Sequence, residues 1–134
     1  MKKSIFLLAL ALMPVLTGCL STRWKTATQT SDVAGIWTNL DFAGFDPAYL
    51  ILRNDGTYTI APNPEGIGGN SGNYWFENKQ IFLSDAFCTT PETYQVKLKL
   101  EEGQPPKLVF TAIGEVCRGN TFTTRELIWV GEAP

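Results

Sequence analysis

The chain of 134 residues contains no histidine and few charged residues. The absence of histidine excludes Ser-His-Asp triads, Cys-His dyads, histidine general bases and histidine-ligated zinc. Charged residues make up 18% of the chain and the formal net charge is −2, so a broad basic surface for nucleic acid is not expected. No carboxylate pair or Ser/Lys motif marks a catalytic site. We therefore expect neither an enzyme nor a bound metal or cofactor.

The first 18 residues have the pattern of a secretory signal peptide. Met1-Lys2-Lys3 is basic, and the apolar run from Ile5 to Val15 is interrupted only by Pro14. This run is too short to be a membrane-spanning helix. It ends in Leu16-Thr17-Gly18-Cys19, which resembles the lipobox of bacterial lipoproteins. The alternative is an ordinary signal peptide followed by a chance cysteine.

The lipobox resemblance implies cleavage before Cys19, a diacylglyceryl thioether on its sulfur and an acylated amino group. Two or more acyl chains give stable membrane anchoring. Leu20 stands where an aspartate favours retention at the inner membrane, so the resemblance implies an outer-membrane lipoprotein that faces the periplasm. We accordingly divide the chain into a signal peptide (1–18), a lipidated N-terminus and tether (19–32) and one folded domain (33–134).

Two cysteines remain after the lipidated one. Export places Cys88 and Cys117 in an oxidising compartment, where an even pair usually forms a disulfide. Closing a loop of this length stabilises a fold by roughly 3.5 kcal/mol in the chain-entropy model. The alternatives are a metal site, which lacks histidine ligands, and a redox pair, for which there is no Cys-x-x-Cys motif.

The domain has the sequence pattern of an all-β protein. Short strand-like runs are separated by turn residues such as Asn54-Asp55-Gly56, and no segment has a sustained apolar period of 3.6. We expect at most one helical turn, near Pro91, and a small antiparallel up-and-down barrel or a sandwich. The predicted strands are 35–40, 48–53, 57–61, 72–77, 80–84, 94–100, 107–113 and 121–130.

The order of landmarks along the chain resembles the lipocalin-like, or calycin-type, domains of many bacterial lipoproteins. The landmarks are Gly35-x-Trp37, Leu50-x-Leu52-x-x-Asp55-Gly56-Thr57-Tyr58, Gly72-x-Tyr74, Cys88, Tyr94, Leu108-x-Phe110 and Glu115-x-Cys117. The resemblance covers about residues 33–130 and implies a barrel of about eight strands. It also implies that Trp37 packs at the closed end, with the guanidinium of Arg125, or alternatively of Arg118, across its ring.

Several residues are candidates for binding. Leu52, Tyr58, Trp75 and Phe110 would line a ligand cavity, although aromatic side chains on strands usually only pack in the core. The segment 41–47 is expected to be a loop that presents Phe42 and Phe45, either for recognition or folded over the barrel end. The glycine-rich segment 62–71 lacks the Gly-Lys-Ser/Thr of a phosphate loop and is expected to be a flexible loop or a lid.

Two functions follow from these expectations. The first is an envelope lipoprotein that binds a small apolar or amphipathic molecule. The alternative is a barrel that acts by protein contact, similar to periplasmic inhibitors of proteases or lysozymes; Ser71-Gly72-Asn73-Tyr74 is one residue shorter than the Ser-Gly-x-x-Tyr signature of one such family. An open cavity would favour the first function, and a packed interior with exposed loop aromatics would favour the second.

Overall fold

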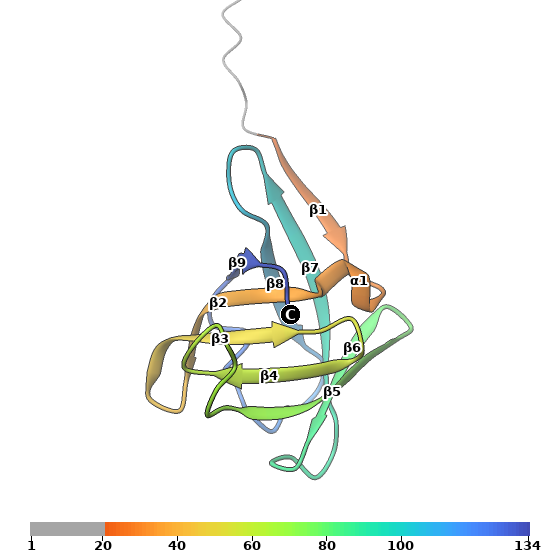
Figure 1. Ribbon diagram of the computed structural model, residues 1–134. Coiled ribbons are helices and arrows are strands. Elements are labelled where there is room, and N and C mark those ends of the chain that lie inside the picture. The colour runs from red at the N-terminus through yellow and green to blue at the C-terminus, as the bar shows by residue number, and fades with distance from the viewer. Residues whose placement is uncertain (1–20) are drawn as a thin grey trace, which may run out of the picture.

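The computed structural model of the chain describes residues 21–134, so the expected signal peptide and Cys19 lie outside the described residues. The described part is almost entirely β-structure, as predicted (Figure 1). Its elements are β1 (Thr22–Thr26), α1 (Thr30–Val33), β2 (Gly35–Phe42), β3 (Phe45–Leu52), β4 (Thr57–Ala61), β5 (Asn70–Glu77), β6 (Gln80–Asp85), β7 (Glu92–Glu101), β8 (Lys107–Ala112) and β9 (Leu127–Gly131).

Strands β2 to β9 form a closed, antiparallel, eight-stranded barrel, which confirms the predicted lipocalin-like fold class. Each strand pairs with the next along the chain, and β9 pairs back with β2 through Trp37 and Trp129. Closure leaves none of the eight strands with a fully free edge. The barrel strands agree with the predicted ones, except that β9 is shorter because residues 121–126 belong to a loop of turns.

Two N-terminal elements differ from the expected tether at 19–32. Strand β1 pairs with Lys97–Glu101 in the second half of β7, and the amide of Ala27 donates to the carbonyl of Val96 at 2.9 Å. The single helical turn is α1 and not a segment near Pro91, where the chain leads directly into β7. The expectation of a tether is therefore wrong for residues 22–32, because backbone pairing orders a segment that has little apolar content of its own.

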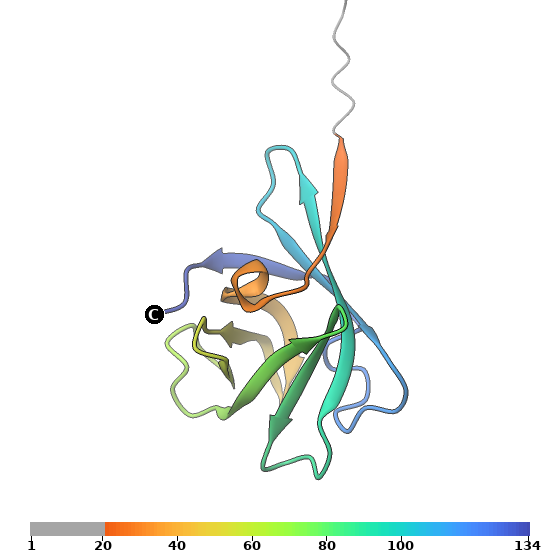
Figure 2. The ribbon, with the colours of Figure 1, turned by 90° about the vertical axis from the view of Figure 1, so that its right-hand side faces the viewer.

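Strand β7 belongs to two parts of the molecule. Its first residues pair with β6, and its last residues pair with β1 along the same edge, while β8 pairs with the other edge. The β1 strand, the end of β7 and the start of β8 therefore extend beyond the barrel as a three-stranded projection, which we call the arm. Figures 1 and 2 both show the arm projecting above the barrel.

The barrel interior is filled by side chains. Strand alternation points one face of each strand inward, and the expected lining residues Leu52, Tyr58 and Phe110 are part of this packed core. Trp75 is a correction: its neighbour Tyr74 points inward, so Trp75 lies on the outer surface and stacks on Phe82 at 5.6 Å. The core also contains Leu40, Leu50, Ile60, Ile81, Leu83, Tyr94, Val96, Leu108, Phe122 and Leu127.

One end of the barrel is closed by indole packing. Trp37 is 1% exposed, and its Nε1 donates to the carbonyl of Val33 in α1 at 2.9 Å. The Trp129 ring meets it edge-on at 5.2 Å, and a Cβ at Gly35 would overlap this second indole, so only glycine fits there. Figure 2 shows α1 lying over this end, which we call the Trp37 end.

Candidate functional site

The end of the barrel opposite Trp37 carries four connections, which together we call the rim. Because neighbouring strands alternate in direction, the β2–β3, β4–β5, β6–β7 and β8–β9 connections all lie there. They comprise residues 43–44, 62–69, 86–91 and 113–126. The turns at the Trp37 end are shorter on the whole, so most of the irregular chain of the barrel is gathered at the rim.

Each of the four connections presents an exposed apolar side chain at or beside it. Phe45 next to the β2–β3 turn is 50% exposed, and Ile67, Phe87 and Ile113 are 71%, 69% and 38% exposed. Single exposed apolar residues are common on protein surfaces, but four of the six exposed large apolar side chains of residues 21–134 gather at this one end. The rim is therefore the candidate functional site.

The β2–β3 connection is tighter than expected for a loop over 41–47. Phe42 pairs with Phe45 across the two-residue turn Ala43-Gly44, whose φ values are 52° and 83°. Positive φ at both central residues is typical of the turns that join tight β-hairpins. Phe42 and Phe45 are consequently held on strand ends and not in a loose loop, which fixes their direction at the rim.

A small apolar hollow lies between this hairpin and the β4–β5 connection. Its volume is about 130 Å³. Phe42, Phe45, Ile60 and Pro62 contribute apolar walls, while Gly68 and Gly69 form part of its border. The hollow is much smaller than the several hundred cubic ångströms of a typical ligand site. It can receive a single side chain or a similarly small apolar group.

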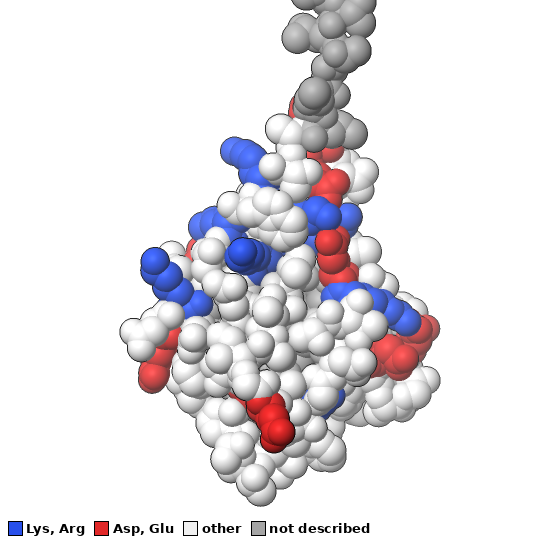
Figure 3. All heavy atoms as spheres, turned by 180° about the vertical axis from the view of Figure 1, so that it is seen from behind, with Lys and Arg blue, Asp and Glu red and all other residues white. Residues whose placement is uncertain are grey.

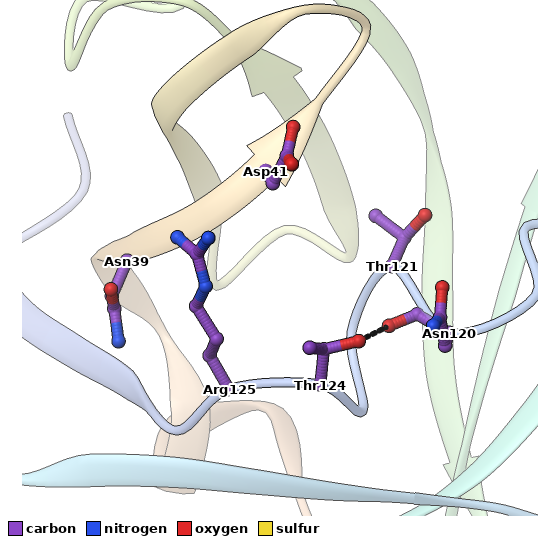
Figure 4. Close-up of a pocket in the computed structure, with 6 residues that line it drawn as sticks. All are labelled: Asn39, Asp41, Asn120, Thr121, Thr124 and Arg125. Atoms are coloured by element: carbon purple, nitrogen blue, oxygen red, sulfur yellow. Dashed lines mark hydrogen bonds between the residues drawn. The ribbon is translucent and has the colours of Figure 1, made fainter.

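A second, polar hollow of about 200 Å³ lies where the β8–β9 loop passes the end of β2. In Figure 4 the Arg125 guanidinium lies between Asn39 and Asp41, and Thr124 donates to the carbonyl of Asn120. Arg125 also donates two hydrogen bonds, of 2.7 and 2.9 Å, to the carboxylate of Asp46. These bonds hold the pKa of Asp46 below its usual range. The hollow adds hydrogen-bonding groups beside the apolar rim.

Beneath the rim, three charged side chains are buried together. The Arg118 guanidinium pairs with Asp85 and, at 2.6 Å, with Glu92, and each of the three side chains is at most 2% exposed. The backbone amide of Arg118 also donates to Glu92 at 2.9 Å. Burying charge is costly unless each group is paired and hydrogen-bonded. This arrangement meets that condition for both carboxylates and fixes the loop that carries Arg118.

Two core tyrosines extend this buried charge cluster. Tyr58 donates to Asp85 at 2.7 Å, and Tyr94 donates to Glu92 at 3.0 Å. Burial raises the pKa of Tyr58 and, together with the charge of Glu92, that of Tyr94. Both hydroxyl groups therefore remain protonated hydrogen-bond donors across the physiological pH range.

The structure brings Cys88 and Cys117 together at disulfide distance, as predicted. They are bonded, and their Cα atoms are 5.9 Å apart. The bond joins the β6–β7 connection to the β8–β9 connection, next to the buried charge cluster, since Arg118 directly follows Cys117. Phe122 on the same β8–β9 connection stacks against Phe110 at 5.3 Å and closes this end from within.

The expected contact of a guanidinium with Trp37 requires correction. Arg125 pairs with Asp46, and the alternative, Arg118, pairs with Asp85 and Glu92. Over the described residues, neither cation lies across the Trp37 ring, which contacts Trp129 instead. The physical reason is that a carboxylate offers each guanidinium directed hydrogen bonds, whereas an indole face offers none.

The buried charge cluster was missed by reasoning from the sequence, although a signal for it exists. Arg118 follows Cys117, and Asp85 and Glu92 stand on either side of Cys88. A disulfide between these cysteines necessarily brings the three charges into one neighbourhood. Within residues 21–134 there is no group of three or more histidine, cysteine or acidic side chains placed to hold a metal ion.

Comparison with known proteins adds no family assignment. No protein-family model matches the chain, and no curated protein or solved structure shows significant similarity to it. Among the helices of residues 21–134, none combines the length and the apolar character needed to cross a bilayer.

Proposed function

We propose that this chain is a lipid-anchored envelope lipoprotein whose barrel acts by contact with another exported protein through the rim. The observation that carries this proposal is the combination of a packed interior with an exposed apolar side chain on each of the four rim connections. An inhibitor or an accessory subunit of an exported enzyme is the kind of protein that uses such a surface.

The filled interior favours protein contact over a ligand cavity. None of the hollows described above is lined by Leu52, Tyr58 or Phe110, and the rings of Tyr94, Phe110 and Phe122 pack against one another at 5.3 to 5.7 Å. Binding of a small apolar or amphipathic molecule stays a prediction, and the apolar hollow beside Phe45 is the place for it.

The charges around the rim indicate the chemistry of the partner. Asp41, Glu65 and Glu115 are exposed and form no ion pair with any other described residue, whereas the neighbouring Arg125 is neutralised by Asp46. An apolar centre surrounded by carboxylates complements a basic surface with a concave apolar patch. The proposed partner is therefore a basic exported protein, which fits the class of cell-wall or peptide hydrolases.

Photo-crosslinking in the intact cell envelope tests this function. A photoreactive amino acid replaces Phe87 or Ile67 at the rim, and a matched variant carries it at Lys79, an exposed turn residue at the Trp37 end. We expect one discrete protein adduct from both rim positions and none from Lys79. The adduct is then identified by mass spectrometry of its peptides.

Binding measurements with the identified protein complete the test. We expect Phe87→Ser and Ile67→Ser to weaken the affinity of the purified chain by about tenfold or more, as for interface hot spots, and Lys79→Ser to leave it unchanged. The proposal is overturned by equal crosslinking from Lys79. It is also overturned if native mass spectra of the membrane-extracted chain show a stoichiometric small molecule while the rim yields no adduct.

A further inference from the structure

The outer face of the arm combines an exposed indole with lysines. Trp24 in β1 stands opposite Lys99 in β7, which stands opposite Lys107 in β8, so the three side chains share one face. The Lys99 ammonium lies 5.5 Å from the centre of the Trp24 ring, which is nevertheless 52% exposed. Lys97 lies two residues from Lys99 on this face and is also exposed.

Charge is distributed unevenly between the arm and the rest of the described chain. The arm and the acidic groups beside it hold a small excess of positive charge, whereas the barrel and rim are strongly negative. Five cations belong to the arm, namely Arg23, Lys25, Lys97, Lys99 and Lys107, against the four carboxylates of Asp32, Glu101, Glu102 and Glu126. The remaining described residues include four cations and nine carboxylates.

Figure 3 shows this distribution from behind. Most of the Lys and Arg atoms lie in the upper part of the molecule, with several Asp and Glu atoms beside them, and the lower part is largely uncharged with an acidic group. An anionic surface would therefore attract the arm and repel the rest of the domain. This uneven distribution of charge defines an orientation of the barrel relative to an anionic surface.

The position of β1 in the chain limits how far the arm can be from the lipidation site. Only Leu20 and Ser21 separate Cys19 from Thr22, the first residue of β1. A fully extended chain advances at most about 3.5 Å per residue, so the two backbones are within about 10 Å of each other. Because β1 is hydrogen-bonded to β7, an acyl anchor at Cys19 holds the arm at the membrane without a flexible tether.

We propose that the outer face of the arm docks on the anionic phospholipid surface in which the chain is anchored. Trp24 lies at the level of the headgroups, where indole rings are preferred. Lys99 and Lys107 share the carboxylates of Glu101 and Glu126 on this face, so Lys97, which forms no ion pair among the described residues, is the cation left to attract the lipid phosphates. The rim, at the opposite end of the barrel, is then directed away from this membrane. The inference rests on the anchoring part of the proposed function but not on the identity of the rim's partner.

Tryptophan fluorescence of the full acylated chain tests the docking. The chain is reconstituted in vesicles of phosphatidylethanolamine and phosphatidylglycerol that are brominated near the headgroup. The signal of Trp24 is the difference between the wild type and Trp24→Phe, and that of Trp75, on the outer wall of the barrel, comes from Trp75→Phe in the same way. We expect bromine to quench more than half of the Trp24 signal and almost none of the Trp75 signal.

Charge-reversal variants separate docking from mere proximity to the anchor. Lys97→Glu is expected to reduce the quenching of Trp24 at least twofold and Lys97→Gln to reduce it by less, while replacement of phosphatidylglycerol by phosphatidylcholine is expected to act like Lys97→Glu. Lys79→Glu, which reverses a charge on an exposed turn outside the arm, is the matched control and is expected to change nothing. Quenching that is insensitive to the lipid charge and to the arm variants overturns the inference.

The intact mass of the chain and the rim crosslinks distinguish this inference from the proposed function. An acylated chain with an unquenched Trp24 overturns the docking and leaves the anchor and the rim contact in place. A chain without acyl groups overturns both the anchor and the docking. Loss of the rim crosslinks with Trp24 still quenched overturns the rim contact alone.

Discussion

The two ends of the barrel are closed by different physical means. At the Trp37 end, two indoles and a short helix meet over a glycine, and the interactions are mainly apolar packing. At the rim, a buried charge cluster and a disulfide hold long connections in place above the core. The Trp37 end therefore depends on apolar packing, whereas the cluster and the disulfide anchor the connections 86–91 and 113–126 and leave Phe87 and Ile113 exposed.

This difference separates the stabilising end of the molecule from the end that we propose to be functional. Loops that carry recognition residues need a rigid support that does not use their own outward-facing side chains. The buried cluster of Arg118, Asp85 and Glu92 provides that support from beneath. The comparison predicts that changes at the Trp37 end alter stability alone, while changes at the rim alter stability and binding together.

The largest expected effect is that of Arg118→Ala. The substitution leaves two buried carboxylates without their cation, and breaking buried ion pairs in this way costs about 3 to 5 kcal/mol. We expect a loss at the upper end of this range in the free energy of unfolding, measured by urea denaturation. Arg125→Ala, which removes a partly exposed ion pair, is the control, and a loss of similar size there would contradict the assignment.

The same cluster allows a sharper test. Combining Arg118→Met with Asp85→Asn and Glu92→Gln removes every charge, so that no buried carboxylate is left without its cation, which is the source of the cost in Arg118→Ala. We expect the triple variant to be markedly more stable than Arg118→Ala. If the triple variant is as unstable as Arg118→Ala, the main contribution of Arg118 is the packing of its side chain and not the compensation of the two carboxylates.

Trp37→Ala is expected to have the next largest effect. Removing a buried tryptophan side chain costs about 3 to 5 kcal/mol, because its packing is lost and a cavity remains. Thermal unfolding measures the loss, and the fraction that still folds should keep its rim crosslinks, since the two ends lie at opposite sides of the barrel. A variant of normal stability that loses rim binding would reverse the roles that we assign to the two ends.

Removal of the disulfide is expected to cost somewhat less and to affect the rim selectively. Native disulfides that close loops of this length contribute roughly 3.5 kcal/mol. We expect the paired substitution Cys88→Ala and Cys117→Ala to lower the free energy of unfolding by that amount and to increase hydrogen exchange in the connections 86–91 and 113–126. Exchange around Trp37 should stay slow; a uniform increase over the barrel would show that the bond does not act locally.

The smallest expected effect concerns alkaline pH. Burial raises the pKa of Tyr74 to about 12, and its hydroxyl donates to the carbonyl of Arg53 at 2.5 Å. Above the unfolded-state value of about 10, only the unfolded chain loses this proton, so the stabilisation is complete below that pH and declines as the pH rises towards 12.

Comparison of the wild type with Tyr74→Phe measures this decline. The advantage of the wild type should shrink by about 1 kcal/mol between about pH 9 and pH 11, since one pKa unit corresponds to 1.36 kcal/mol. Tyr58→Phe, at the rim end, should change the pH dependence in the same direction. A constant difference between wild type and Tyr74→Phe over this range would contradict the raised pKa.

Most of the barrel could be predicted from the sequence. Runs bounded by Gly, Asn, Asp and Pro predicted all eight barrel strands, and the expectation of export, with two cysteines left besides Cys19, predicted the disulfide. The strands follow from the local chemistry of the turn residues, and the disulfide follows from the number of cysteines. In contrast, β1 has a polar sequence, and it is ordered only because the distant strand β7 is long enough to offer it a free edge.

The remaining errors have physical causes that a single sequence does not reveal. Tyr74 and Trp75 are adjacent aromatic residues on opposite faces of β5, and either could have pointed inward. The partner of Arg125, Asp46, lies far away along the chain with no cysteine beside it to indicate the contact, and the choice between a carboxylate and an indole depends on the folded geometry. Residues that act through long-range charge pairing are therefore the least predictable part of the candidate site.

The antiparallel pairing of β1 with β7 has a mechanical consequence for a chain held at its N-terminus. Tension from that side pulls along the axis of β1, since Thr22 is at the outer tip of the arm and Thr26 is nearest the barrel. Such a force shears all five residue pairs at once and does not peel them apart one by one. Load therefore passes through β7 into the barrel wall, and the barrel is displaced as one body with the arm.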